Sequence, residues 1–152
     1  VESYRQHFRP SEFLTEPKVN VTIQVLCAET EEEARHLSGS RNLVRLNIVR
    51  GRRRGVATPE EALAYPYSQD ELAYLEQYLR TNVDGDPQQV KEKLDRLSEA
   101  FQTSDLGIVT ICYDFAKRIR SYELVAEACG LTAPNPEQIN DIPATLSHNV
   151  AD

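Results

Sequence analysis

The stretch "NVDGDPQQVKEKLDRLSEAF", Asn82 to Phe101, predicts one sharply bounded helix. Asp86 can accept hydrogen bonds from the free amides of the first helical turn, and Pro87 suits the next position because its missing N–H costs nothing there. Gln89 follows Asp86 by three residues, which is the spacing of a capping box. The apolar side chains then recur at helical spacing, at Val90, Leu94, Leu97 and Phe101. We interpret Gly-Asp-Pro as a helix cap, since a phosphate-binding loop would need more glycine and no acidic neighbour.

Two strands are predicted on either side of this helix in the sequence. "VNVTIQVLCA", which starts at Val19, alternates apolar residues with Asn20, Thr22 and Gln24, so its second face is small and polar and suits a filled or ligand-bearing interior. "LGIVTICY", Leu106 to Tyr113, is apolar nearly throughout, as in a parallel strand covered on both faces. We expect the two strands to be parallel and adjacent, because β-α-β connections favour that arrangement.

The remaining elements are predicted to be helices and one long loop. Tyr4 to Glu12 is interpreted as the end of a helix, and Phe115 to Cys129 as a last helix that stops at Gly130. Two further helices begin at Thr30 and Ser68, with apolar stripes at Ala34, Leu37, Val44 and Ile48 and at Leu72, Leu75 and Leu79. The segment from Arg50 to Gln69 has two prolines, four arginines and no period, so it is predicted to be a mobile or irregular loop.

Composition excludes several classes of protein and partner. The net charge of −7 over 152 residues argues against nucleic acid as the main partner. No apolar run approaches the roughly 20 residues that a membrane span needs, so no membrane partner is expected. Cys27, Cys112 and Cys129 are too scattered for a disulfide scaffold or a metal site, and they indicate a reducing cytoplasm. The absence of methionine suggests a fragment of a longer protein.

Three stretches in order carry a resemblance to a known family. "YRQHFRPSEFL" leads into "VNVTIQVLCAETEEEA", "GDPQQVKEKL" follows, and "IVTICYDFAKRIRSYELVAEA" comes last. Together they resemble the C-terminal part of the bacterial-luciferase-like (alkanal monooxygenase-like), flavin-dependent monooxygenases. The resemblance implies an α/β fold: the last two β-strands, with their helices, of a (β/α)8 TIM-type barrel. Residues 1–131 would be this barrel segment with a mobile loop inserted at 50–69, and 132–152 a Pro-rich, poorly ordered tail.

The same resemblance implies an oxidoreductase and a flavoprotein. Family members use FMN and molecular oxygen to oxidise an aldehyde or a similar small organic substrate. Their FMN ligands and catalytic groups come largely from earlier strands, so no catalytic residue can be carried over to this chain. We therefore expect the isolated chain to be inactive and to form homo-oligomers that cover its exposed strands. The alternative is a non-catalytic truncated module that self-associates.

The candidate cofactor-binding residues lie in two places. Arg50, Arg52 and Arg53 fall in the segment that corresponds to the family's mobile active-site loop, where they would contact an anionic flavin or its phosphate. Thr110 and Tyr113 lie at a predicted carboxyl strand end, where barrel enzymes place their active sites. The alternatives are a solvated basic loop for the arginines, and packing of Tyr113 under a loop beside a helix cap at Asp114.

Overall fold

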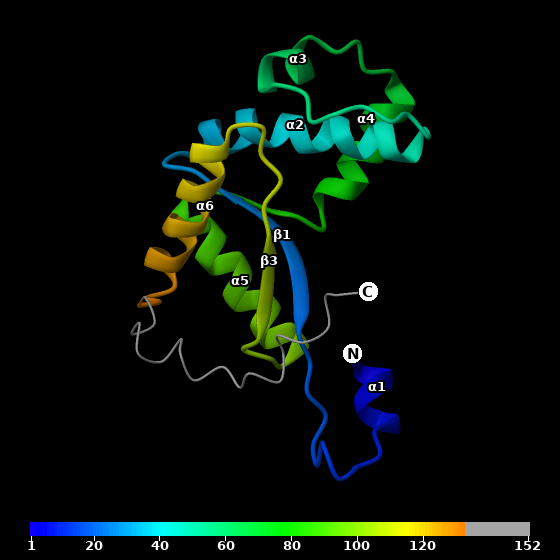
Figure 1. The fold of residues 1–152 in the computed structure, drawn as a ribbon, viewed down its shortest axis with the longest axis vertical. Coiled ribbons are helices and arrows are strands. Elements are labelled where there is room, and N and C mark those ends of the chain that lie inside the picture. The colour runs from blue at the N-terminus through cyan, green and yellow to red at the C-terminus, as the bar shows by residue number, and fades with distance from the viewer. Residues whose placement is uncertain (133–152) are drawn as a thin grey trace, which may run out of the picture.

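The computed structural model describes residues 1–132, which form an α/β unit with a parallel sheet (Figure 1). The predicted Pro-rich tail, 132–152, lies outside the described residues from 133 onward. In chain order the elements are α1 (Glu2–His7), β1 (Val21–Cys27), α2 (Glu31–Val49), α3 (Pro59–Ala64), α4 (Gln69–Leu79), β2 (Val83–Gly85), α5 (Pro87–Phe101), β3 (Leu106–Val109) and α6 (Phe115–Ala128).

The sheet has the strand order β2-β1-β3, and both pairs are parallel. The prediction that β1 and β3 are parallel and adjacent is therefore confirmed. The two halves of β1 have different partners, because 21–24 pair with β3 and 25–27 pair with β2. The prediction of only two strands was wrong. The missed strand, β2, has three residues with the turn-like sequence Val-Asp-Gly, and only its pairing with β1 makes it extended.

The third strand is shorter than the sequence predicted. β3 ends at Val109, although the apolar run continues to Tyr113. The backbone N–H of Thr110 donates to the Tyr122 hydroxyl of α6 at 3.1 Å. The Thr110 hydroxyl donates to the Val25 carbonyl of β1 at 2.9 Å, so a side chain occupies this backbone acceptor where the chain leaves the sheet.

The main apolar core lies between one face of the sheet and helices α5 and α6. Ile23, Val25 and Cys27 of β1 belong to one buried cluster with four helical residues, Val90, Leu94, Leu124 and Val125. We call this side the outer face of the sheet. Figure 1 shows α5 and α6 together on this side of β1 and β3.

Helix α5 matches its prediction closely. Asp86 accepts from the Gln89 N–H at 2.9 Å, and the Gln89 side chain accepts from the Asp86 N–H at 3.1 Å, which completes the capping box. Val90 and Leu94 are buried in the core. The helix ends at Gln102, which has the left-handed conformation common at helix ends (φ 48°).

Helix α2 is continuous through Gly39, and its predicted apolar stripe was half wrong. Ala34 and Leu37 are buried, whereas Ile48 is 63% exposed. The second half of α2 buries Leu43 and Leu46 instead. This half packs against α3, which the sequence did not predict, and against α4.

The predicted loop at 50–69 contains one short helix, α3. Thr58 and Glu61 form a capping box around its first turn, and Pro59 follows the cap. The irregular parts are therefore shorter than predicted; the mobility of this segment stays a prediction. The next helix, α4, begins after Ser68 as predicted, and Ser68 and Glu71 form a capping box. Only Leu75 of its predicted stripe is buried.

Candidate functional site

The carboxyl ends of the three parallel strands meet at one edge of the sheet, and a helix begins shortly after each. The helix N-caps are Thr30 for α2, Asp86 for α5 and Asp114 for α6. The Asp114 carboxylate accepts from the Lys117 N–H at 2.9 Å, so the capping alternative for this residue is confirmed. This edge is where parallel α/β folds usually bind ligands.

The second face of the sheet carries polar, small and aliphatic side chains. In-register neighbours of a parallel pair share a face, and the pairs are Leu26 with Asp84, Thr22 with Gly107, and Gln24 with Val109. We call this set the inner face: Thr22, Gln24, Leu26, Asp84, Gly107 and Val109. The polar character predicted for the second face of β1 is thus present at Thr22 and Gln24 and extends to a carboxylate of β2.

A buried ion pair lies on the inner face near the carboxyl edge. Arg41 of α2 donates to both carboxylate oxygens of Asp84, at 2.8 and 2.6 Å. The arginine side chain is 1% exposed and the aspartate side chain 21%. The Arg41 Nε has no hydrogen-bond partner among residues 1–132. A buried guanidinium depends on such a bidentate partner, because an unpaired charge is very costly inside a protein.

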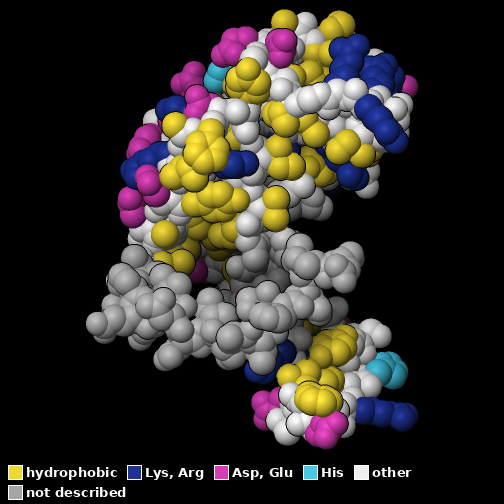
Figure 2. Space-filling view, in the orientation of Figure 1, with side chains coloured by type: hydrophobic (Ala, Val, Ile, Leu, Met, Phe, Trp, Pro, Cys, Tyr) yellow, Lys and Arg dark blue, Asp and Glu magenta, His cyan; other side chains and the backbone are white. Residues whose placement is uncertain are grey.

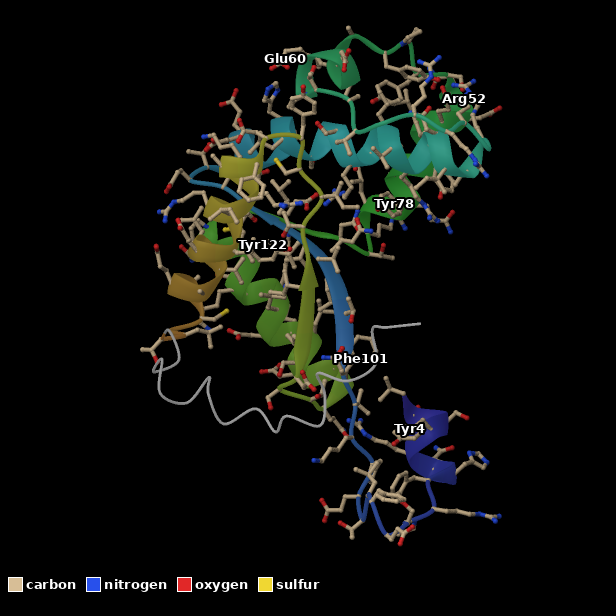
Figure 3. The ribbon with its side chains drawn as sticks, in the orientation of Figure 1. Tyr4, Arg52, Glu60, Tyr78, Phe101 and Tyr122 are labelled. Atoms are coloured by element: carbon tan, nitrogen blue, oxygen red, sulfur yellow. The ribbon has the colours of Figure 1, made fainter. Side chains whose placement is uncertain are left out.

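A second polar contact joins α4 to the inner face. The Tyr78 hydroxyl donates to Gln24 Oε1 at 2.7 Å (Figure 3). The Tyr78 ring is stacked with that of Tyr74, and Arg45 of α2 lies over both rings, 5.2 and 5.9 Å from their centroids. Arg45 Nε also donates to the Tyr74 hydroxyl at 2.7 Å. This arrangement fixes the orientation of the Gln24 amide, with its oxygen occupied by Tyr78.

Thr110 and Tyr113 lie near this edge in different environments. The Thr110 side chain is buried, and its hydroxyl donates to the Val25 carbonyl at 2.9 Å. Tyr113 is 54% exposed. The two residues flank Cys112, which packs against the buried cluster that holds Ala34 and Leu37 of α2.

The arginines of the predicted loop lie beyond the other end of α2. Arg50 pairs with the buried Glu71 at 3.2 Å, and Arg52 donates to the Tyr65 hydroxyl at 3.0 Å. The Ser68 backbone N–H that donates to Glu71 holds the pKa of this carboxyl below its usual value. Arg53 lines a shallow groove with Arg52 and neighbouring residues. Figure 2 shows the basic side chains gathered at this end of the molecule.

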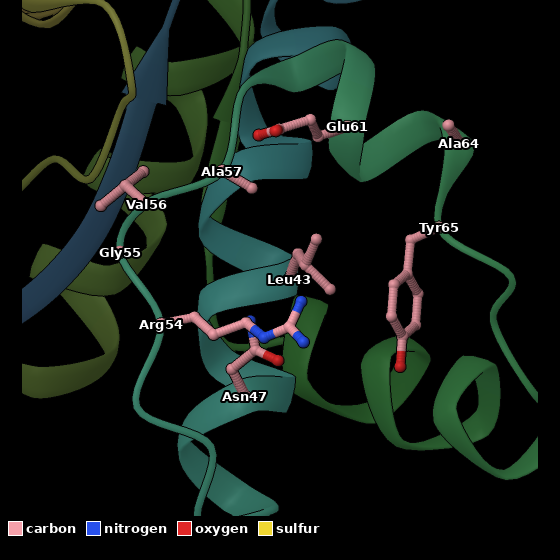
Figure 4. A pocket seen from close by; sticks show the side chains of 9 residues that line it. All are labelled: Leu43, Asn47, Arg54, Gly55, Val56, Ala57, Glu61, Ala64 and Tyr65. Atoms are coloured by element: carbon pink, nitrogen blue, oxygen red, sulfur yellow. The ribbon is translucent and has the colours of Figure 1, made fainter.

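A cleft of about 510 Å³ lies between α2 and the segment that leads through α3 (Figure 4). Asn47 and Leu43 of α2 form one wall. Arg54, Glu61 and Tyr65 contribute the polar groups on the other side. The cleft therefore offers both charges and an apolar wall, next to the arginine segment.

The structure does not bring the two groups of predicted cofactor ligands together. Helix α2 has 19 residues and is about 28 Å long at 1.5 Å per residue. Thr110 and Tyr113 lie towards its first turns, whereas the arginines follow its last turn. The cofactor role of each residue stays a prediction.

Sequence reasoning missed Arg41, Asp84, Arg45 and the contact between Gln24 and Tyr78. A signal for Arg41 was present, because Ala34, Leu37 and Arg41 follow each other at helical spacing on one stripe. An arginine on a buried stripe indicates a buried acidic partner. The partner itself was hidden, because the strand that carries Asp84 resembles a turn.

The cysteines have no features of reactive thiols. Burial raises the pKa of Cys27 to about 11, and burial also raises the pKa of Cys112. All three cysteines are free, and Cys112 and Cys129 are half-buried. A raised pKa leaves little thiolate at neutral pH in Cys27 and Cys112.

Charged side chains tie the helices together around the carboxyl edge. Lys117 of α6 binds Glu33 of α2, and Arg120 binds Glu29 at 2.9 Å. Arg120 also pairs with Glu123, three residues further along α6. Within residues 1–132 no group of His, Cys, Asp and Glu side chains could hold a metal ion. No helix in this part of the chain is long and apolar enough to cross a membrane.

The known proteins that this chain resembles are longer than it is. No model of a protein family matches the chain. It is 36% identical over 124 residues to YceB and 34% identical over 129 residues to YwcH, two uncharacterized proteins of Bacillus subtilis. It is 23% identical over 124 residues to a luciferase-like monooxygenase of Escherichia coli. The match to YceB covers 82% of this chain and 38% of YceB, so the chain spans little more than a third of its relatives' length.

A solved structure also matches this chain over only part of its own length. The chain superposes on the crystal structure of apo-MsnO8 with a TM-score of 0.78 and 30% identity. The superposition covers 88% of this chain and 41% of MsnO8. The fold described above therefore recurs as a part of a larger protein. The sequence similarity supports a relation to the luciferase-like monooxygenases.

Proposed function

We propose that this chain is the C-terminal part of a luciferase-like, FMN-dependent monooxygenase that oxidises an aldehyde or a similar small organic substrate with O2. The observation that carries the proposal is the polar inner face, with Arg41–Asp84 and Gln24–Tyr78 at the carboxyl edge of a parallel sheet. The similarity to the luciferase-like monooxygenase of E. coli supports the same class.

The inner face suits the interior of a (β/α)8 barrel. A parallel sheet normally has both faces covered. In residues 1–132, α5 and α6 cover the outer face, whereas α2 and α4 contact the inner face through Leu26, Asp84 and Gln24. A barrel would enclose the inner face and place its carboxyl edge at the active site. The last strands of such a barrel would be β1 and β3, with β2 as a short addition beside β1.

The residues present fit some of the groups that FMN requires. FMN, when bound, supplies the redox chemistry of the reaction. Arg53 and Arg54 provide guanidinium groups of the kind that bind phosphate, and neither has a side-chain ion pair within residues 1–132. The Gln24 amide has its oxygen occupied by Tyr78, so its N–H groups can donate to a carbonyl oxygen of a ring system.

The segment from Arg50 to Gln69 would act as the lid of this site. Arg50–Glu71 and Arg52–Tyr65 fix the two ends of the segment to each other. A lid of this kind excludes water from a reduced cofactor and from the substrate. The same proposal includes that the protein forms homo-oligomers and binds a small-molecule substrate.

A second candidate function is a non-catalytic module that associates with its own copies. The unpaired edges of β1 and β3 favour it, because exposed strand edges promote association. Exposed aromatic side chains at Phe13 and Phe115, 88% and 66% exposed, also favour it. Light scattering distinguishes a self-associating chain from a monomer.

The proposal is tested by titrating the purified chain with FMN while flavin fluorescence is followed. We expect weak or no binding and no monooxygenase turnover, because two strand ends supply a minority of the contacts that a flavin needs. Tight, stoichiometric FMN binding by the monomeric chain would contradict the expectation that this chain supplies only a minority of the flavin contacts.

The decisive arm uses a two-chain complex. The chain is co-expressed with the part of YceB that lies outside the 124 matched residues, and the purified complex is titrated with FMN. We expect binding with one flavin per complex. A complex that forms and binds no flavin would show that the proposed function is wrong.

A further inference from the structure

The cleft between α2 and the segment that leads through α3, which we call the α2–α3 cleft, is a concave site of its own (Figure 4). Its volume of about 510 Å³ is within the range of small-molecule sites. Two of its wall residues, Leu43 and Asn47, lie in the second half of α2, a helix of 19 residues. The cleft is therefore formed by different residues from those at the carboxyl edge of the sheet, where α2 begins.

Two polar side chains with no protein partner line this cleft. Asn47 is only 5% exposed, and its side-chain amide makes no hydrogen bond within residues 1–132. The Arg54 guanidinium has neither an ion pair nor a hydrogen bond in the same part of the chain, and Figure 4 shows both side chains turned into the cleft. A buried amide normally has a hydrogen-bond partner, because burial removes its contacts with water. The pair is therefore suited to a polar, negatively charged group of a ligand.

The opposite wall of the cleft is an aromatic ring in a fixed orientation. The Tyr65 hydroxyl accepts from Arg52 at 3.0 Å and donates to Glu71 at 3.0 Å. Its ring contacts that of Tyr67 edge to face, with centroids 4.8 Å apart. In Figure 4 the Tyr65 ring lies across the cleft from Leu43. A fixed ring opposite an aliphatic side chain favours a flat, apolar ligand body, because an aromatic ligand can stack on one wall and pack against the other.

We propose that the α2–α3 cleft binds a small aromatic carboxylate. Its carboxylate would be held by Arg54 and Asn47, and its ring would lie between Leu43 and Tyr65. A guanidinium binds a carboxylate through two parallel hydrogen bonds, and the Asn47 amide can donate a third. The geometry of this cleft is independent of the proposed function.

The charges around the cleft favour a carboxylate over a phosphate. Glu61 also lines the cleft, and no ion pair joins it to Arg54 within residues 1–132. Its negative charge repels a phosphate dianion more strongly than a carboxylate, which has a single charge. If Arg54 binds the carboxylate, Arg53 is the neighbouring guanidinium that is left for a phosphate of FMN.

The test measures binding of phenylacetate to the purified full chain by calorimetry and by NMR shifts of the Asn47 side-chain amide. Phenylethanol, which has no charge, and phenyl phosphate, which has the same ring, are titrated in parallel. Arg54→Met removes the proposed carboxylate ligand. Arg53→Met removes the same charge from the next residue, which does not line the cleft, and is the matched control. Circular dichroism verifies that each variant keeps its fold.

A third variant separates the role of Asn47 from stability. Asn47→Leu keeps the size of the side chain and removes an amide that makes no hydrogen bond within residues 1–132. It should therefore leave the thermal unfolding temperature unchanged or raise it, and still weaken phenylacetate binding. If this variant does not fold, the comparison of Arg54→Met with Arg53→Met decides, because both arginines are exposed.

We expect phenylacetate to bind one site per chain and to shift the Asn47 amide signal. Arg54→Met should weaken binding about tenfold or more, as expected for hydrogen bonds to a charged group, and Arg53→Met should leave it within about twofold. Three results would overturn the proposal: no saturable binding of phenylacetate, equal binding of phenylethanol or tighter binding of phenyl phosphate, or equal losses from Arg53→Met and Arg54→Met. FMN is absent from these titrations, so their failure is distinct from a failure of flavin binding by the two-chain complex.

Discussion

The two faces of the sheet are built by different kinds of interaction. On the outer face, Ile23, Val25 and Cys27 pack against apolar side chains of α5 and α6. On the inner face, Leu26 packs against Ala34 and Leu37 of α2. The polar contacts there are an ion pair, Arg41–Asp84, and a hydrogen bond from Tyr78. Apolar packing is non-directional and tolerates similar side chains, whereas polar pairs demand particular atoms at particular distances. The difference indicates that the outer face stabilises the unit and the inner face presents oriented groups.

The largest effect is expected from breaking the ion pair of the inner face. Asp84→Ala should lower the free energy of unfolding by about 3–5 kcal/mol, because Arg41 would stay buried without its partner. Urea denaturation followed by circular dichroism measures the change. The double variant Arg41→Met with Asp84→Leu removes both charges and should recover most of the loss. An Asp84→Ala variant that loses less than 1 kcal/mol would show that the inner face does not depend on this pair.

Sequence patterns predicted the outer face better than the inner one. The cap at Asp86 and the stripe through Val90 and Leu94 identified α5, because each signal is local to one helix. The alternation through Ile23 and Val25 identified β1 for the same reason. These patterns arise because one side of each element is buried and apolar, and this side is visible as a regular spacing of apolar residues in the sequence.

The contacts of the inner face were harder to predict, and so were the short elements β2 and α3. β2 has three residues, and α3 has six, so neither shows a period. The sequence signal for α3 was the capping box at Thr58 and Glu61, and the one for β2 was the turn-like sequence before Asp86. The pairing of Arg41 with Asp84 joins residues 43 positions apart, which no local pattern specifies. The site residues therefore had to be found in the fold.

A smaller effect is expected from removing the hydroxyl that orients Gln24. Tyr78→Phe should lower the free energy of unfolding by about 0.5–1.5 kcal/mol, the net value of one hydrogen bond, while ring stacking persists. Ile23→Val, a matched change on the outer face, should cost a similar amount. The NMR signal of the Gln24 side-chain amide distinguishes the two variants. Only Tyr78→Phe should shift it strongly, and equal shifts would refute the assigned role of Tyr78.

The smallest effect is expected at the rim that joins the two faces, where Glu33 of α2 binds Lys117 of α6. The hydrogen bond from Lys117 lowers the pKa of Glu33. A lowered folded-state pKa contributes stability above the unfolded value of about 4.3, and this contribution is lost as the pH falls through the folded value. Since Lys117 is half-exposed, Glu33→Gln should cost only about 0.2–1 kcal/mol at pH 7 and nothing near pH 2.

Glu32 provides the control for this last change, since it lies in the same first turn of α2 and has no ion pair within residues 1–132. Any effect of the helix dipole should be similar for Glu32→Gln and Glu33→Gln, so their difference isolates the contact with Lys117. Urea denaturation at pH 7 and at pH 2 measures the difference between the two variants in the free energy of unfolding. Adding about 1 M salt should reduce this difference, because exposed charges are screened. A difference that grows as the pH falls would show that the sign of the Glu33 contribution has been assigned wrongly.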